Sequence, residues 1–283
     1  MEDFVHLHVH TNYSILDGQS KVTRLVDKAI ADGMKGMAIT DHGVMFGIKE
    51  FSDYCAKINK ERKAKGEEPF KPIFGCEMYV ARRSMHDKEK DKHDNSGYHL
   101  IVLAKNYNGY KNLIKLVSHA WVDGYYYKPR TDREELEKYH EDLIVCSACI
   151  AGEVPNKIIR GDIEGAREAC EWYHRVFGDD YYLELQRHEV KDPTLVANRE
   201  AYPLQQKANK VLMQFAKEYG IKLVCTNDCH FEDKETAEAH DHLLCLSTNE
   251  DLDDPKRMRY SKQEWFKTRQ EMNEVFSDVP EAM

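Results

Sequence analysis

The sequence lacks any long apolar run. The longest apolar stretches, around residues 100–104 and 143–151, have the length of strands and fall far short of the roughly 18 residues that a membrane-spanning helix needs. The N-terminus carries Glu2 and Asp3 and has no basic segment followed by an apolar one, so no secretion signal is expected. The sequence therefore predicts a cytoplasmic protein without a membrane partner.

An excess of positive charge is also missing. The 283 residues include 41 Lys and Arg against 50 Asp and Glu, a formal net charge of −9. Because DNA binding by bulk charge depends on Lys and Arg that neutralise phosphates, a simple basic DNA-binding module is excluded. A site that acts on phosphates is not, since bound divalent cations reverse the local field. Eight cysteines do not suggest a disulfide scaffold and fit a reduced compartment.

Glycine-rich motifs that bind nucleotide phosphates are absent, because neither a GxGxxG nor a GxxxxGK[ST] pattern occurs. What the chain does contain is an alternation of apolar strand-like segments with segments of helical periodicity, among them helices at 162–177 and 194–219. The predicted strands are 4–10, 36–40, 72–81, 99–104, 143–147, 181–185 and 221–226. This order predicts an α/β fold with a parallel sheet, either a barrel or an open doubly wound sheet.

The charged stretch 84–96 predicts a mobile loop, and the pattern changes after residue 226. Residues 234–246 suit a helix, and two shorter helices are expected where Ser261 precedes Glu264 and Thr268 precedes Glu271 as capping boxes. We therefore predict a barrel over residues 1–231 and a C-terminal helical extension over 232–283. Because no terminating feature precedes Met283, the chain is expected to be part of a longer protein.

Residues of the metal-binding types recur at the ends of the predicted strands. On the first strand, alternation places His8 and His10 on one face together with Phe4 and His6. The others are Asp17, His42, Glu77, His99, Cys149, Asp228 and His230. Each has an ordinary explanation, such as a polar strand face, a turn or a buried thiol. Since the carboxyl ends of barrel strands meet on one face, their coincidence predicts a metal cluster there.

The number of candidate ligands bounds the number of ions. A catalytic zinc ion usually takes about three protein ligands, so nine candidates suit two or three divalent ions. Imidazole and thiolate favour Zn²⁺, whereas carboxylates also admit Mn²⁺ or Fe. The cations would make the site neutral or positive, which suits an anionic substrate.

Six short motifs resemble those of the polymerase and histidinol phosphatase (PHP) family. They are HLHVHT at 6–11, TDHG at 40–43, GCE at 75–77, YHL at 98–100, CSAC at 146–149 and TNDCH at 226–230. A further set resembles the PHP domains found at the N-terminus of bacterial DNA polymerase III alpha subunits: YSILDG at 13–18, FG at 46–47, NGYKNL at 108–113, KPR at 128–130 and LDDP at 252–255. The likeness runs from Phe4 to about Glu281.

The resemblance implies a distorted (β/α)₇ barrel, similar to a TIM barrel, with three metal ions. One ion would be held by His8, His10, Glu77 and Asp228; a second by Glu77, His99 and Cys149; and a third by Asp17, His42 and His230. In some relatives several of these positions carry non-ligands, whereas here all nine are ligand-competent. His6 departs from the Asp that many non-polymerase members have, and Asp41 is expected to orient ligand histidines.

In family terms the activity would be metal-dependent phosphodiester hydrolysis by a metal-activated water, a 3′–5′ exonuclease that proofreads a DNA-directed DNA polymerase. The expected partners are a single-stranded DNA 3′ end, the remaining polymerase domains and other replisome subunits. Lys128 and Arg130 follow three tyrosines and are candidates for DNA contact, or else belong to a solvated loop. His188 either contacts substrate or satisfies a neighbouring group. The alternatives are a free-standing phosphatase for small esters and a non-catalytic, metal-stabilised scaffold.

Overall fold

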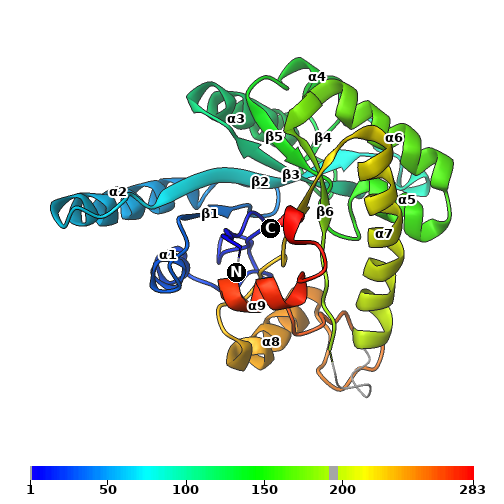
Figure 1. The fold of residues 1–283 in the computed structure, drawn as a ribbon. Coiled ribbons are helices and arrows are strands. Elements are labelled where there is room, and N and C mark those ends of the chain that lie inside the picture. The colour runs from blue at the N-terminus through cyan, green and yellow to red at the C-terminus, as the bar shows by residue number, and fades with distance from the viewer. Residues whose placement is uncertain (1, 191–196) are drawn as a thin grey trace.

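The fold is built on a curled seven-stranded sheet. A computed structural model describes residues 2–190 and 197–283. The strands follow the order β1 (Gly36–Ile39), β2 (Lys71–Ala81), β3 (Gly97–Ala104), β5 (Leu143–Cys146), β6 (Tyr181–Leu185) and β7 (Lys222–Cys225), with the short β4 (Arg130–Thr131) beside β2 (Figure 1).

The N-terminal segment closes this sheet into a distorted barrel. The backbone oxygen of His6 accepts from Ala38 N in β1 at 2.8 Å, and on the other side His10 N donates to the oxygen of Cys229 at 2.7 Å. Residues 6–10 therefore lie between β1 and the chain that follows β7. The predicted fold class is confirmed, but the predicted first strand is reduced to an isolated bridge between Val9 and Cys229.

The expectation of an all-parallel sheet is wrong at β3, which runs antiparallel to both β2 and β5. No crossover helix separates β2 from β3, so the chain returns directly beside the strand it has just left. The connecting stretch, predicted as a mobile loop, holds a 3₁₀ turn, η1 (Lys90–Lys92), and is anchored. Arg83 pairs with Asp94, whose backbone oxygen also accepts from Arg130 at 2.7 Å.

Helices pack around the barrel with their apolar faces inward. Along the chain they are α1 (Val22–Ala31), α2 (Ile48–Ala64), α3 (Tyr107–Val122), α4 (Arg133–Lys138), α5 (Glu153–Arg160), α6 (Ile163–Phe177) and α7 (Ala197–Tyr219), with a 3₁₀ turn, η2 (Gly178–Asp180), before β6. In α1, Val22, Leu25, Val26 and Ala29 are buried at the i, i+3, i+4, i+7 spacing of one helix face. The sequence did not predict α4 and α5, and residues 194–196 of the helix predicted from 194 lie outside the described part of the chain.

The C-terminal segment returns to the barrel after η3 (Lys234–Thr236) and α8 (Ala237–Thr248). It contains α9 (Arg269–Val275), which begins with the predicted capping box of Thr268 and Glu271, and η4 (Pro280–Ala282). Ser261 does bond to Glu264, but no helix begins there. Phe276 and Val279 belong to the barrel core, and the two chain ends lie close together (Figure 1). The division of the chain at residue 231 stays a prediction.

Across the described residues, no helix combines the length and apolar composition that a bilayer-spanning segment requires.

Candidate metal centre

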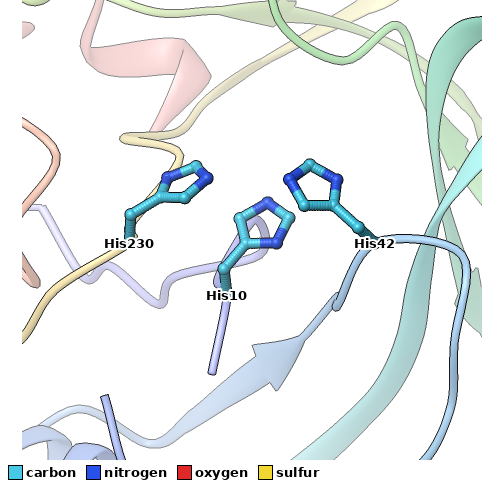
Figure 2. Close-up of side chains that lie close together, drawn as sticks. All are labelled: His10, His42 and His230. Carbon is cyan, nitrogen blue, oxygen red and sulfur yellow. The ribbon is translucent and has the colours of Figure 1, made fainter. Parts of the chain in front are cut away.

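The nine predicted ligand residues gather at one end of the barrel. Their side-chain N, O and S atoms are linked by a continuous series of contacts of 4.0 Å or less. Figure 2 shows the rings of His10, His42 and His230 turned toward one another from three separate segments. Residues more than 200 positions apart in the sequence therefore share one site.

The first group surrounds the Nε2 atoms of His8 and His10. Asp228 Oδ1 lies 3.0 Å from His8 Nε2 and 3.3 Å from His10 Nε2. Glu77 lies on the other side, with Oε1 at 3.4 Å from His8 and Oε2 at 3.2 Å from His10. Two imidazoles and two carboxylates thus face a common point.

Partners on the far side of each ring fix which nitrogen carries the proton. His8 Nδ1 lies 2.7 Å from the Glu184 carboxylate, to which it donates. Ser14 Oγ donates to Asp41 Oδ1 at 2.7 Å, so it accepts from His10 Nδ1 at 2.9 Å. Both Nε2 atoms are therefore left as lone-pair ligands that face the carboxylates.

A second group lies beside the first and shares Glu77 with it. His99 Nδ1 lies 2.7 Å from Glu77 Oε1, and the Cys149 thiol lies 3.7 Å from the same His99 nitrogen. Cys149 Sγ is 4.0 Å from Glu77 Oε1. Imidazole, thiolate and carboxylate are together typical of a zinc site.

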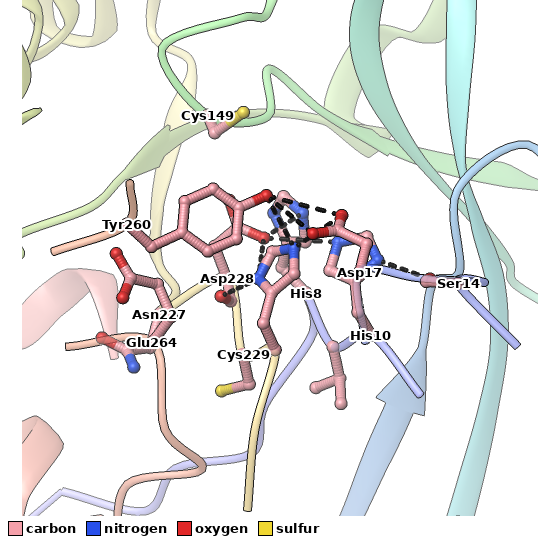
Figure 3. A network of polar contacts seen from close by, with 12 residues as sticks. His8, His10, Ser14, Asp17, Cys149, Asn227, Asp228, Cys229, Tyr260 and Glu264 are labelled. Carbon is pink, nitrogen blue, oxygen red and sulfur yellow. Dashed lines mark hydrogen bonds and ion pairs between the residues drawn. The ribbon is translucent and has the colours of Figure 1, made fainter. Parts of the chain in front are cut away.

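The third group joins Asp17, His42 and His230. Asp17 Oδ2 lies 2.6 Å from His42 Nε2 and 3.4 Å from His230 Nε2. His230 donates its Nδ1 proton to the backbone oxygen of Asp228 at 2.8 Å, which leaves Nε2 to face Asp17. The Tyr260 hydroxyl donates to Asp17 Oδ1 at 3.1 Å (Figure 3).

Buried polar atoms without hydrogen bonds indicate that this cluster is suited to binding cations. Buried polar atoms ordinarily find hydrogen-bond partners, because a buried unpaired group costs about 1–3 kcal/mol. Five side-chain atoms that point into the cluster form no hydrogen bond of good geometry, although they lie only 2.7–3.3 Å from one another: His8 Nε2, His10 Nε2, His42 Nδ1, Glu77 Oε2 and Asp228 Oδ1. All five are atom types that ligate divalent ions, so the residues present suit a metal centre.

The backbone next to three of these ligands is left-handed. Asp228 has φ of +50°, and Leu16 and Ala148, which precede Asp17 and Cys149, have φ of +61°. Such values are uncommon for residues other than glycine and occur where the surroundings hold them. Beside Asp17, a Cβ on Gly18 would lie 2.0 Å from the backbone oxygen of Thr11, so only glycine fits this turn.

The electrostatics favour positive charge in the cluster. Burial lowers the pKa of His42, but the Glu77 and Asp17 carboxylates more than offset this and raise it to about 10. Burial likewise opposes ionisation of Asp228, yet the neighbouring His8 and His230 hold its pKa well below its usual range. The field that stabilises imidazolium in this pocket also stabilises a divalent cation at the same place.

Two histidines outside the nine do not join the cluster: His6 leaves its predicted face, and His188 takes one of its two predicted roles. His6 turns away from the cluster, packs against Phe266 with ring centroids 4.2 Å apart, and bonds through Nε2 to the backbone oxygen of Lys267. This happens because residues 6–10 are not a regular strand, so the expected alternation fails. His188 is buried and bonds to the backbone oxygen of Asn227 at 3.0 Å, so it satisfies neighbouring groups, and a direct substrate contact is not supported.

The prediction that Arg130 contacts DNA is wrong for this conformation. Its guanidinium is fully buried and donates to three backbone oxygens, those of Gly124, Asp94 and Met85, at 2.7–3.1 Å. Lys128, two residues away, is exposed, lines the pocket at the centre and lies 5.3 Å from the ring centroid of Tyr79.

The sequence reasoning missed several supporting residues. Glu184 ends a predicted strand, as several candidate ligands do, but it was not included among the nine, and Ser14, four residues after His10, carries no signal of its own. Tyr260 comes from the C-terminal segment, and only the folded chain brings its hydroxyl to Asp17. Asp41, in contrast, has its predicted orienting position, since it reaches His10 through Ser14.

A pocket of about 570 Å³ opens over the cluster and is lined by Asp17, His42 and His99. A larger cavity of about 710 Å³ lies at the opposite end of the barrel, among Leu7, Ile73, Phe74 and Tyr182. The larger cavity is mostly apolar and includes none of the predicted ligands. Choosing the candidate site by cavity volume alone would therefore select the other end of the barrel. The smaller pocket is therefore the candidate site.

Comparison with known proteins identifies the family. A PHP domain profile matches residues 6–188. The DNA polymerase III alpha subunits of Borreliella burgdorferi and Treponema pallidum are 41% and 40% identical over 99% of this chain, which spans 23% and 22% of their lengths. The alpha subunit of Thermus aquaticus is 38% identical over 99% of this chain and 21% of its own.

Among solved structures, histidinol phosphate phosphatase of Lactococcus lactis aligns with a TM-score of 0.37 at 14% identity, covering 86% of this chain and 93% of that one. An amidohydrolase of Chromobacterium violaceum aligns with a TM-score of 0.42 at 13% identity, covering 80% and 87%. The profile match covers more than half of the chain and agrees with the motifs at the cluster. The chain therefore belongs to the PHP domain family and corresponds to the PHP region of DNA polymerase III alpha subunits.

Proposed function

We propose that this chain is a metal-dependent phosphodiesterase that removes nucleotides from the 3′ end of single-stranded DNA, as the proofreading domain of a replicative polymerase. The observation that carries the proposal is the set of five buried ligand atoms that converge in one pocket without a hydrogen bond of good geometry. The names of the polymerase relatives suggest DNA as the polymer.

Two or three divalent ions, most readily Zn²⁺ and alternatively Mn²⁺ or Fe, would be held by the three groups described above. Glu77 would be shared between the first and second groups, because its two oxygens face different imidazoles. A pair of such ions supplies a nucleophilic water and charge stabilisation for phosphoryl transfer.

The remaining residues of the pocket orient and bind. Ser14 and Asp41 hold the His10 ring, Glu184 holds His8, and the Tyr260 hydroxyl holds Asp17. Lys128 is the cationic side chain best placed to meet a phosphate at the pocket edge. We assign no side-chain general base, because the carboxylates and imidazoles described above serve as ligands or hold ligands.

In this proposal the DNA-polymerising activity belongs to parts of the longer protein outside this chain. Its partners would be those polymerase domains, other replisome subunits and the 3′ end of a single strand, in the cytoplasm. Synthesis of DNA by this chain alone is not expected.

The direct test is to incubate the metal-loaded chain with 3′-labelled single-stranded DNA and, separately, with small phosphate esters. We expect the unmodified chain to release labelled nucleotide. Asp228→Asn and His10→Ala should each lose both this activity and bound metal. Cleavage of the small esters alone would favour a free-standing phosphatase. Full metal content without any hydrolysis would favour the non-catalytic scaffold, and unchanged metal and hydrolysis in both variants would refute the site.

A further inference from the structure

We propose that Trp121, Tyr125 and Tyr127 form a nucleobase-stacking platform at the edge of the metal centre. The platform would bind the unpaired bases of the strand whose terminal phosphodiester enters the pocket. This inference rests on the proposed function for the identity of the substrate, and it adds a binding site that selects strands by their exposed bases.

The platform is connected directly to the metal centre. The indole Nε1 of Trp121 donates to the backbone oxygen of Gly43 at 2.7 Å, and Gly43 follows the ligand residue His42. All three aromatic residues line the same pocket as His42 and His99. A base that stacks on this platform would leave its own backbone phosphate close to the cluster.

The three aromatic side chains are exposed to solvent and do not belong to the protein core. Trp121 is 42% exposed, Tyr125 47% and Tyr127 58%. Trp121 and Tyr125 stack on each other with centroids 5.5 Å apart and planes at 19°, so each ring covers one face of the other and a base would stack on an outward face. Flat aromatic faces stack with any base, which is how proteins bind single strands without reading sequence.

The turn that carries the platform is held in place from below. Buried Arg130 donates through Nε to the backbone oxygen of Gly124 at 3.1 Å, and its guanidinium lies over the Tyr126 ring at 5.6 Å. Tyr127 has φ of +62°, a left-handed conformation that is rare for a bulky residue, and Tyr126 N donates to the oxygen of Lys128 at 3.1 Å. The rings are therefore preorganised, and binding need not order them.

The chemistry of the edge favours a nucleic acid over an apolar peptide. Lys128 directly follows the platform residue Tyr127, and its ammonium group lies 5.3 Å from the ring centroid of Tyr79. Tyr79 in turn packs against His42 and His99, at 6.0 and 5.2 Å between centroids. Stacking faces beside a phosphate-binding charge are the two elements of a single-strand site. In a duplex the base faces are already stacked, so paired ends should bind less well.

The test compares binding of two oligonucleotides that differ only in their bases. One is a short 5′-labelled oligothymidylate; the other has abasic tetrahydrofuran residues at its last 3′ positions, and both carry phosphorothioate linkages that slow hydrolysis. Fluorescence anisotropy with the metal-loaded chain gives each dissociation constant. We expect the thymine-bearing strand to bind about 5- to 150-fold more tightly for each stacked base.

Variants assign this preference to the platform. Trp121→Ala and Tyr125→Ala should each reduce the ratio of the two dissociation constants toward one, while Trp121→Phe, which keeps a flat ring, should retain part of it. Tyr107→Ala is the matched control, because Tyr107 is a 73% exposed aromatic at the other end of α3, about 21 Å along the helix from Trp121. It should keep the full ratio.

The outcomes separate this inference from the proposed function. The platform would be overturned if the unmodified chain bound both strands with equal affinity. It would also be overturned if Trp121→Ala weakened the affinity for both strands by the same factor, even if DNA is hydrolysed. The second result would indicate that Trp121 supports the pocket or meets a protein segment. A retained base preference without hydrolysis of ordinary DNA would overturn the nuclease and support the platform.

Discussion

Replacing Glu77 by Gln should remove more metal than any other single ligand substitution. Glu77 is 1% exposed, and its two oxygens lie 2.7–3.4 Å from nitrogens of four histidines, namely His8, His10, His42 and His99. The amide keeps the shape of the side chain but removes the negative charge and replaces one acceptor with a donor. Both groups that share Glu77 should therefore lose their ions.

The size of the effect follows from mass action. An ion present at a free concentration of about 1,000 times its Kd stabilises the folded state by about 4 kcal/mol. Loss of two such sites removes about 8 kcal/mol, a large part of the 5–15 kcal/mol that stabilises an ordinary domain. At about 2 °C for each kcal/mol in a chain of this length, the Tm should fall by about 16 °C.

Asp17→Asn gives the internal comparison. Asp17 contacts only His42 and His230 among the predicted ligands, so this variant should lose one ion and about half as much stability. Glu141→Gln, which changes an exposed carboxylate in the same way, should lose neither. Metal per chain is counted by mass spectrometry after dialysis, and Tm by calorimetry. If Glu77→Gln keeps as many ions as Asp17→Asn, the shared role of Glu77 is refuted.

Three further predictions test the supporting structure. Ser14→Ala removes the acceptor of His10 Nδ1 and the hydroxyl that donates to Asp41. Metal affinity measured by titration should fall about 10- to 100-fold. An unchanged affinity would show that Ser14 does not support the site. Arg130→Met leaves three backbone oxygens without their donor and should lower the free energy of unfolding by about 3–5 kcal/mol in urea, and a change below about 1 kcal/mol would contradict the anchoring role. Burial lowers the pKa of Lys267 to about 8, so the unfolded state binds more protons than the folded state between pH 8 and 10.5. The free energy of unfolding should therefore rise by about 3 kcal/mol over that range relative to Lys267→Met. Parallel pH profiles of the two proteins would refute this.

Much of the fold was predictable because its helices and central strands obey simple periodicities. The apolar stripe of α1 and the apolar strands β2, β5 and β6 were found from their patterns alone. The closing segment was harder, since residues 6–10 make barrel hydrogen bonds without strand geometry. The reversal at β3 could not be seen either, because strand direction depends on the path of the connection and not on the apolar pattern.

The candidate site was predicted better than its surroundings. Ligand types at strand ends are a local signal, so nine residues could be chosen from the sequence, and the structure brings these nine together. Their role as metal ligands stays a prediction. Residues that act through other residues leave a weaker signal. Glu184, Ser14 and Tyr260 matter only because the fold brings them to His8, His10 and Asp17. Arg130 was misassigned for the opposite reason: an arginine after a row of tyrosines suggests DNA contact, and only burial reveals three backbone carbonyls as its partners.

The position of the ligands links metal binding to closure of the barrel. His8 and His10 lie on the segment that joins β1 to the chain after β7, and Asp228 and His230 lie on the other side of that seam. The seam has few backbone hydrogen bonds, so cations that ligate both sides would strengthen it where the sheet is weakest. The C-terminal segment adds to the same place, because His230 N donates to the backbone oxygen of Glu264 at 2.8 Å. A metal centre at this seam would therefore serve stability and chemistry together. Loss of hydrolysis in a variant can then be assigned to chemistry only when metal content and Tm are measured on the same sample.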